Sequence, residues 1–159
     1  MRTTILAAAA AAAVTVIATA SFADAAPKAG GTTTTIKTTM TVTALTNVDT
    51  DGNGGPSVGD LDIFSEVQND AKTNRLVGNG TAVCTETDGA GQQFTCTGET
   101  DFGANEIQEG FRYLPASTTF RAAILGGTGT YQGAYGQMTG TWVDAKHDKA
   151  SVVFTITTR

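Results

Sequence analysis

Glycine density between residues 124 and 140 constrains this chain more than any other feature of its sequence. The segment reads ILGGTGTYQGAYGQMTG, so a short apolar run meets a glycine turn, and a second run interrupted by glycines follows. Closely spaced glycines mark positive φ angles or close backbone approach, and within strands they mark bulges and corners. A nucleotide loop is excluded, because Gln132 replaces the third glycine of a dinucleotide loop and no Lys-Ser/Thr pair follows. The segment predicts a hairpin of a β protein, more specifically a barrel corner without a helix, whose turn residues are Gly126, Gly127, Gly129, Gly133 and Gly136.

The rest of the chain indicates strands joined by short turns. From residue 32 the chain alternates: the apolar residues Ile36, Met40, Val42, Ala44 and Val48 share one parity, and the other parity is mostly Thr and Lys, as in a long half-buried strand. With 19 glycines, only 16% charged residues and no long helical stripe, the composition favours an all-β protein. Further strands are predicted at 61–67, 75–84, 94–102, 106–113, 118–125, the later part of 124–140 and 151–157. About eight strands fit one antiparallel barrel with room for a small ligand, and an open sandwich of about seven fits the same pattern.

The string GGTGTYQGAYGQ at 126–137 resembles the glycine signature of the allene oxide cyclase and dirigent proteins. Earlier blocks resemble the same family in the same order: Val58-Gly59-Asp60-Leu61 with Phe64, then Val77-Gly78 with Gly80 and Cys84. The resemblance covers residue 49 to the end and implies the closed barrel. It also implies a cofactor-free protein that holds a small apolar molecule, and a homotrimer assembled through the outer faces of the barrels.

The beginning of the chain is typical of a secretory leader. Arg2 precedes an apolar run from Ile5 to Ala18, and Ser21 to Ala25 supply the small residues of a cleavage site. We therefore expect residues 1–25 to be a signal peptide that is removed, 26–31 a flexible lead-in, and 32–159 one secreted barrel domain. A net charge of −5 without clusters of Lys or Arg excludes nucleic acid and, after cleavage, a membrane surface as partners.

Two cysteines in an exported chain most simply pair. Cys84 and Cys96 end and begin two predicted strands around the turn-rich residues 87–91, so a hairpin would bring them opposite each other. We predict a disulfide. The family resemblance keeps one alternative open, a free Cys84 thiol within the pocket.

Residues 49–60, DTDGNGGPSVGD, carry the only pattern that suggests a metal. Asp49, Asp51, Asn53 and Asp60 stand at positions 1, 3, 5 and 12 of a calcium loop of the EF-hand type. Pro56 replaces the usual aliphatic residue, and the preceding segment is a strand rather than a helix. The alternative is an ordinary turn in which Asp, Asn and Gly bond the backbone, and we assign no metal.

Catalytic residues are not evident. The single histidine, His147, lies among charged residues between two strands, which predicts a solvated loop position. The family's polar Glu-x-Asn pattern on the first strand has no counterpart in residues 41–46. For the wall of a ligand cavity we predict Tyr131, Tyr135 and Trp142, although aromatic residues on strands also fill plain cores.

Three functions fit these observations. The barrel is a cofactor-free isomerase, cyclase or coupling guide for a small apolar metabolite, or it binds such a molecule without reacting, or it is a structural extracellular protein with a filled core. A calcium-stabilised extracellular domain is a further alternative. The first two require an apolar cavity with a few inward polar groups.

Overall fold

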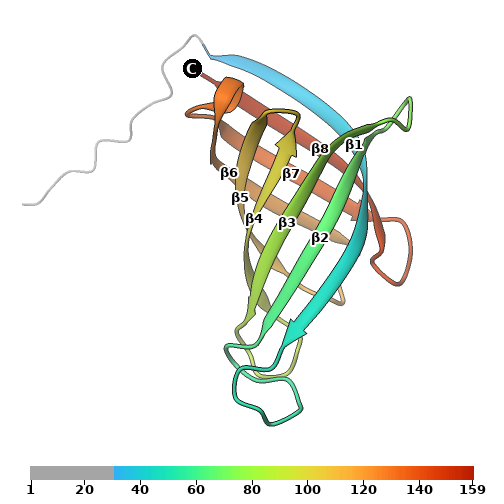
Figure 1. Cartoon of the computed structure of the whole chain (residues 1–159), viewed down its shortest axis with the longest axis vertical. Coiled ribbons are helices and arrows are strands. Elements are labelled where there is room, and N and C mark those ends of the chain that lie inside the picture. The colour runs from blue at the N-terminus through green and yellow to red at the C-terminus, as the bar shows by residue number, and fades with distance from the viewer. Residues whose placement is uncertain (1–30) are drawn as a thin grey trace, which may run out of the picture.

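The computed structural model describes residues 31–159, which form a closed antiparallel barrel of eight strands (Figure 1). Each strand pairs with its neighbours in chain order, and β1 also pairs with β8, so the sheet has no free edge. The all-β barrel predicted from the sequence is therefore confirmed, and the open sandwich is wrong. The predicted signal peptide lies outside the described residues. The strands are β1 Thr32–Val48, β2 Leu61–Asp70, β3 Leu76–Glu86, β4 Phe94–Phe102, β5 Asn105–Tyr113, β6 Thr119–Gly127, β7 Tyr135–Trp142 and β8 Lys149–Thr158.

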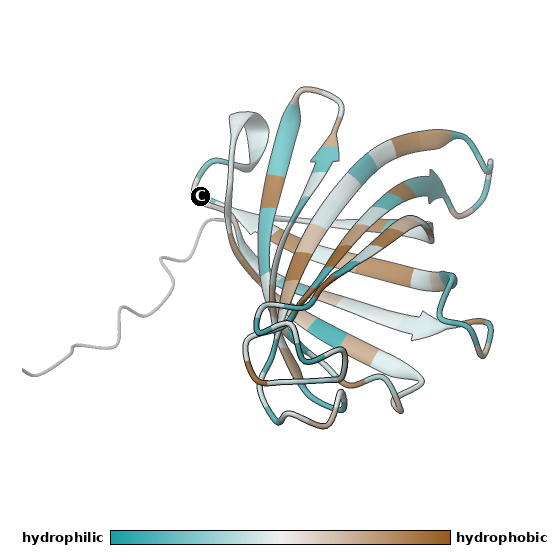
Figure 2. Cartoon of the chain, turned by 60° about the horizontal axis from the view of Figure 1, so that its bottom comes forward, coloured by the Kyte–Doolittle hydropathy of each residue, from teal (hydrophilic) through white to brown (hydrophobic). Residues whose placement is uncertain are grey.

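Alternation along the strands separates the interior from the surface, as a period of two requires. β8 shows it most clearly, because Ala150, Val152, Phe154 and Ile156 are all buried while the residues between them are more exposed. In Figure 2 hydrophobic segments in brown likewise alternate with paler or teal ones along several strands. These four side chains join inward residues of β1 and β5–β7 in the main core.

The long first strand forms as predicted, but only its middle is buried. Met40 is in the core, and Ile36 and Val42 pack against it. A bulge between Val42 and Ala44 then shifts the register with β2, and pairing with β8 stops at Thr41. The prediction that Ala44 and Val48 lie on the buried side is wrong, because beyond the bulge β1 pairs with β2 alone and its last residues are exposed.

The glycine segment connects β6 to β7. Gly126 and Gly127 end β6, and a single 3-10 turn, η1 (Gly129–Tyr131), follows. The segment opens no α-helix, as predicted, and contains only this single 3-10 turn. Gly129 has a φ of 58°, a left-handed conformation that lets the chain enter this turn. At Gly136, where φ is 145°, a Cβ atom would lie 2.0 Å from the Thr155 carbonyl oxygen of β8, so glycine allows the two backbones to approach.

The two ends of the barrel differ. At one end, called the mouth below, β1, β3, β5 and β7 end and β2, β4, β6 and β8 begin, with connecting loops 49–60, 87–93, 114–118 and 143–148. The loop of residues 49–60 projects from this end at the bottom of Figure 1. Toward the other end the interior is filled by the main core, including Ile107, Ile124 and Phe154. No helix among residues 31–159 is long and apolar enough to cross a membrane.

Candidate functional site

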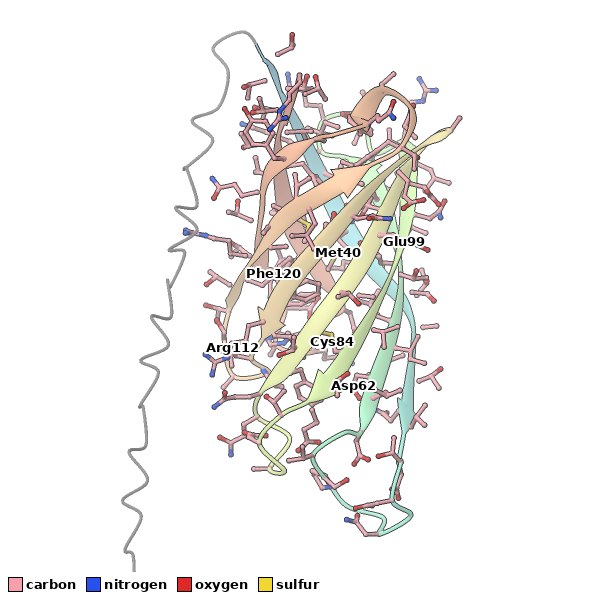
Figure 3. The ribbon with its side chains drawn as sticks, turned by 90° about the vertical axis from the view of Figure 1, so that its left-hand side faces the viewer. Met40, Asp62, Cys84, Glu99, Arg112 and Phe120 are labelled. Carbon is pink, nitrogen blue, oxygen red and sulfur yellow. A yellow bond between two sulfur atoms is a disulfide. The ribbon has the colours of Figure 1, made fainter. Side chains whose placement is uncertain are left out.

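A cavity lies inside the barrel between the mouth and the main core. Met40 and Met138 belong both to the core and to the cavity wall, so the core forms the floor of the cavity. The cavity and its opening enclose ≈ 520 Å³ of space, of which ≈ 40 Å³ is open to the centre of a water molecule. Figure 3 shows where Met40, Phe120 and Cys84 lie along the barrel. The lining residues are Met40, Val42, Phe64, Glu66, Thr81, Ala82, Glu99, Glu109, Phe111, Tyr113, Phe120, Met138 and Trp142.

Most of this lining is apolar, but two glutamates point inward with it. On β2, Glu66 has the same parity as Phe64, and on β5 Glu109 falls between Ile107 and Phe111. Because inward positions alternate along a strand, both carboxyl groups enter the lumen. Glu109 retains only 5% of its accessible surface.

The strands between these two glutamates present glycine to the lumen. Glu66 lies opposite Gly80 of β3, and Glu109 lies opposite Gly98 of β4. A Cβ atom on Gly80 would stand 2.9 Å from Glu66 Oε1. The absence of side chains at both positions makes room for the carboxyl groups in a narrow barrel.

Glu66 ends a short chain of buried hydrogen bonds. The Thr38 hydroxyl donates to Gln68 Oε1 at 2.6 Å, and Gln68 Nε2 donates to Glu66 Oε1 at 2.7 Å. Thr38 and Gln68 are almost completely buried. The amide of Gln68 is thereby fixed with its NH₂ toward the carboxyl group.

Glu109 lacks such a partner. Among residues 31–159, Glu109 Oε1 and the neighbouring Thr100 Oγ1 are buried without a hydrogen bond. Thr100 lies close enough to lower the pKa of Glu109, although the two groups do not meet the geometry of a hydrogen bond. Buried polar atoms are usually paired, and an orphan often marks a place where a water or ligand binds.

Burial raises the pKa of both carboxyl groups, so they stay protonated at pH values well above those at which a glutamate normally ionises. Desolvation raises the pKa of Glu66 to about 7, against which the Gln68 hydrogen bond acts. Desolvation and then the charge of Glu66 raise the pKa of Glu109 to about 8. Near neutral pH this site therefore holds both an acid and a base, which is the condition for moving protons in either direction.

Aromatic side chains line the cavity on the side of the mouth. Trp142 of β7 is stacked on His147, with ring centroids 4.8 Å apart and planes 6° apart, and the Tyr113 hydroxyl lies 3.3 Å from His147 Nδ1. The pKa of Tyr113 is raised by burial and by the nearby charge of Asp62. His147 lies in the loop between β7 and β8, as predicted, but it is half-buried rather than fully solvated, because its ring stacks on Trp142.

The predicted cavity aromatics occupy three different places. Trp142 lines the cavity. Tyr131 lies in η1 and packs against the main core beside Phe102, whereas Tyr135, at the start of β7, is 36% exposed. The structure therefore brings one of the three to the cavity, and their contacts with a ligand stay predictions.

Cys84 and Cys96 form a disulfide, as predicted, so the alternative of a free pocket thiol is wrong. The two residues are directly opposite each other on β3 and β4. Both are buried in a small cluster with Phe94, against which Phe64, Phe111 and Tyr113 pack. The disulfide thus supports the aromatic wall of the cavity near the mouth.

The loop of residues 49–60 brings three carboxylates close together, as a calcium site would require. Oxygen atoms of Asp49, Asp51 and Asp60 lie within 4.8 Å of one another. The same oxygens, however, accept hydrogen bonds from the loop: Asp49 from Gly52 and Gly54, and Asp60 from Thr50 and Ser57. Asn53 also bonds within the loop, donating from its side-chain amide to Asp51 and accepting from Gly55. The hydrogen bonds that Asp49 and Asp60 accept lower the pKa of both carboxyl groups. Such bonds to the backbone are typical of an ordinary turn, the alternative to a calcium loop.

Sequence reasoning did not identify the two glutamates of the lumen. The sequence did contain a signal, since each is a carboxylate at a position of apolar parity within a strand. Pairs close in sequence, such as Glu106 and Glu109, point to opposite faces of the sheet. The pair that converges is separated by more than forty residues and by two intervening strands.

Comparison of the fold places it among known barrels. The fold is that of the allene oxide cyclase and dirigent-like barrels, as the glycine signature implied. The similar solved structures include dirigent proteins, a Diels-Alderase and a cyclase. A pyocyanin demethylase is similar with a TM-score of 0.61 and 28% identity, over 77% of this chain and 99% of that one. The pterocarpan synthase dirigent protein GePTS1 has a TM-score of 0.61 at 18% identity, over 80% of this chain and 84% of that one.

A third similar structure is the Diels-Alderase AbmU from Streptomyces koyangensis, with a TM-score of 0.63 at 12% identity, over 83% of this chain and 71% of that one. Identities this low establish a shared fold. No protein-family model matches the sequence, and no curated protein aligns with it significantly.

Proposed function

We propose that this protein binds a small, largely apolar aromatic molecule in the lumen and catalyses a proton-transfer isomerisation on it with Glu66 and Glu109. The two buried carboxyl groups carry this proposal. A barrel with a merely structural core gains nothing from them, because buried carboxyl groups cost free energy that apolar side chains do not. Strongly shifted pKa values in a cavity are typical of functional sites.

The step requires only these side chains. At neutral pH the ionised member of the pair accepts a proton from an acidic C–H or O–H of the bound molecule. The protonated member donates its proton to a second atom of the same molecule, so a bond shifts while the proton count of the complex stays constant. After the step the two carboxyl groups have exchanged their protonation states. Transfer of one proton between them, directly or through solvent, restores the starting state. The apolar wall excludes water and holds the molecule in one reactive conformer.

Three similarities support a reaction of this kind. Pyocyanin demethylase, at 28% identity over nearly all of its length, acts on one small molecule, and the similar Diels-Alderases and the heme-binding cyclase act on others. Cofactor-free chemistry in this protein is part of the proposal. The runner-up is a barrel that binds the same class of molecule without reacting, which the aromatic lining alone would support.

The present shape of the cavity sets one condition. Ligand pockets usually measure several hundred Å³, and ≈ 40 Å³ of free volume admits only water. A ligand therefore enters when Tyr113, Trp142 and His147 turn aside and the flexible side chains of Met40 and Met138 yield. Methionine adapts in this way at modest cost.

Secretion and assembly are further parts of the proposal. The disulfide supports folding in an oxidising compartment, and the leader-like residues 1–25 support export. Exposed apolar side chains on the outer face, such as Val83 and Leu125, support association into a homotrimer.

The test combines capture with exchange. Purified protein is incubated with the neutral fluorophore N-phenyl-1-naphthylamine and with an extract of small metabolites. We expect fluorescence to increase, and captured molecules to take up deuterium from D₂O at a rate that falls at least about 100-fold in Glu66→Gln and Glu109→Gln. Capture without catalysed exchange would establish the runner-up, and absence of both would indicate a structural barrel.

A further inference from the structure

The charges around the cavity are of one sign. Its lining residues include the inward glutamates Glu66 and Glu109 and no lysine or arginine, and a third glutamate, Glu99, lies on the exposed face of β4. Every lysine and arginine in residues 31–159 is exposed, including Arg112 and Arg121, which flank the cavity on outward-facing positions. Ionised carboxylates in the lumen therefore have no protein cation to neutralise them.

Five aromatic rings share the same wall: Phe64, Phe111, Tyr113, Phe120 and Trp142. The faces of such rings carry partial negative charge and attract cations, more strongly when water is excluded. An aromatic wall by itself favours any apolar molecule. Combined with carboxylates and without basic residues, it favours one that carries a positive charge.

The orphaned atoms point to the same conclusion independently. Glu109 is 95% buried, and its Oε1 accepts no hydrogen bond from the protein. The partner that such an oxygen lacks is a donor or a positive charge. An N–H donor or a ring cation would supply what the protein leaves out.

We propose that the ligand of the lumen is a flat organic cation, a protonated aromatic amine or an N-alkylated heteroaromatic ring, held with its charge against Glu66 and Glu109 and its rings against the aromatic wall. This inference rests on the proposed function, in that it assumes a ligand in the lumen. It adds the chemical class of that ligand. Anionic fatty acids of the same size are excluded as preferred ligands, because the site offers their carboxylate no compensating positive group.

Binding of a cation is coupled to protons. A positive charge beside the two carboxyl groups favours their ionised forms, so the complex releases a proton when it forms below the pKa of about 8 of Glu109. Affinity for the cation therefore rises with pH between about 6 and 8 and levels off above that range. Other titratable side chains near the cavity are Tyr113, Asp62 and Glu86 on inward positions and Glu99 on the exposed face of β4. At the mouth they are His147, Lys146 and the aspartates of the loops 49–60, 87–93 and 143–148, and the Cys84–Cys96 disulfide does not titrate.

The test compares matched rings by isothermal titration calorimetry. The probes are 1-methylquinolinium, a permanent cation, quinoline at about pH 8, where it is neutral, and quinoline-4-carboxylate, an anion. We expect the cation to bind at least about tenfold more tightly than quinoline, a difference of about 1.4 kcal/mol, and the anion not to bind. Titrations in two buffers of different ionisation enthalpy should show a proton released with the cation at about pH 7 and none with quinoline.

Substitutions test whether Glu109 causes the preference for the cation over quinoline. Glu109→Gln should remove about tenfold of the affinity for 1-methylquinolinium and change that for quinoline by less than about twofold. Glu106→Gln is the matched control, because it removes a carboxylate from the same strand on the outward face. Circular dichroism verifies that each variant is folded.

The outcomes separate the two proposals. Equal or tighter binding of quinoline, or an unchanged preference in Glu109→Gln, would overturn the cation assignment and leave lumen binding intact. Failure of all three probes and of N-phenyl-1-naphthylamine to bind would overturn the proposed function together with the cation assignment.

Discussion

Trp142 and His147 lie face to face at the mouth of the barrel, with their ring planes 6° apart. Trp142 ends β7, and His147 belongs to the loop that leads to β8. The hydroxyl of Tyr113, from β5, lies beside the same histidine. Side chains from three separate parts of the chain thus meet beside the cavity at its mouth.

The stack makes the single tryptophan of the chain a reporter of the mouth. His147→Ala should shift Trp142 emission to longer wavelength, because the indole loses its cover and contacts water. The same change should speed ligand association several-fold by removing part of the barrier. Lys146→Ala, an exposed change in the same loop, is the control. Identical spectra and association rates in both variants would show that the mouth is covered by something other than this stack.

The pKa shifts of Glu66 and Glu109 predict how stability depends on pH. Both folded-state pKa values, about 7 and about 8, exceed the ordinary value of 4.5, so the native state binds more protons than the unfolded chain between about pH 4.5 and 8. The free energy of unfolding therefore decreases as pH rises through this window. Glu109→Gln, which stays neutral, should flatten the decrease.

Urea denaturation at several pH values from about 5 to 8.5 measures this dependence. Glu106→Gln should keep the slope of the wild type, since its carboxylate lies on the outer face. A slope in Glu109→Gln equal to that of the wild type would contradict the assignment of a buried, neutral Glu109.

Removal of the disulfide tests its contribution to the mouth. The double substitution Cys84→Ala and Cys96→Ala opens a loop whose ends are 12 residues apart, and the free energy of unfolding should fall by about 3 kcal/mol. Because the bridge supports Phe64, Phe111 and Tyr113, ligand affinity should fall with it. Reduction of the wild type by dithiothreitol should reproduce the loss, and a melt unaffected by both treatments would show that the bridge is dispensable.

Gly140 sets the position of Phe120. A Cβ atom on Gly140 would lie 2.0 Å from Phe120 Cζ, so Gly140→Ala must displace this ring, which lines the cavity. Overpacking of this kind costs about 1–3 kcal/mol, and the displaced ring should reduce probe binding. Gly126→Ala is the control, because its Cβ would lie 3.9 Å from the nearest atom, Gln108 Oε1, and its cost should stay within about 0.5 kcal/mol. Equal effects of the two substitutions would contradict the steric account.

We predict that calcium does not stabilise the protein through the acidic loop of residues 49–60. Since the carboxylates of Asp49 and Asp60 already accept backbone hydrogen bonds, we expect millimolar calcium to leave the thermal midpoint unchanged and Asp49→Ala to lower it modestly by loosening the loop. A midpoint that rises with calcium concentration, as ligand linkage requires, and that no longer responds in Asp49→Ala would establish the calcium alternative.

Local features of the sequence predicted the architecture well. Alternation in residues 94–102 and 106–113 and turns rich in glycine and aspartate indicated about eight strands, and the structure has eight. The pattern also fitted a sandwich, and the family resemblance of the glycine segment of residues 124–140 favoured the barrel. Deviations occurred where packing decides the outcome. The bulge after Val42 redirects the end of β1, and the 3-10 turn at Gly129–Tyr131 depends on contacts with β5.

The sequence by itself determined the strands, the hairpin that opposes Cys84 and Cys96, and the resemblance to a barrel family, because each of these depends on neighbours within a few residues or on one contiguous motif. Only the tertiary structure revealed the candidate site. Glu66 and Glu109 meet because the sheet closes and because Gly80 and Gly98 leave space between them, and His147 reaches Trp142 because a loop folds back over the mouth. Their pKa values depend on burial and on each other's charge, which are properties of the closed barrel.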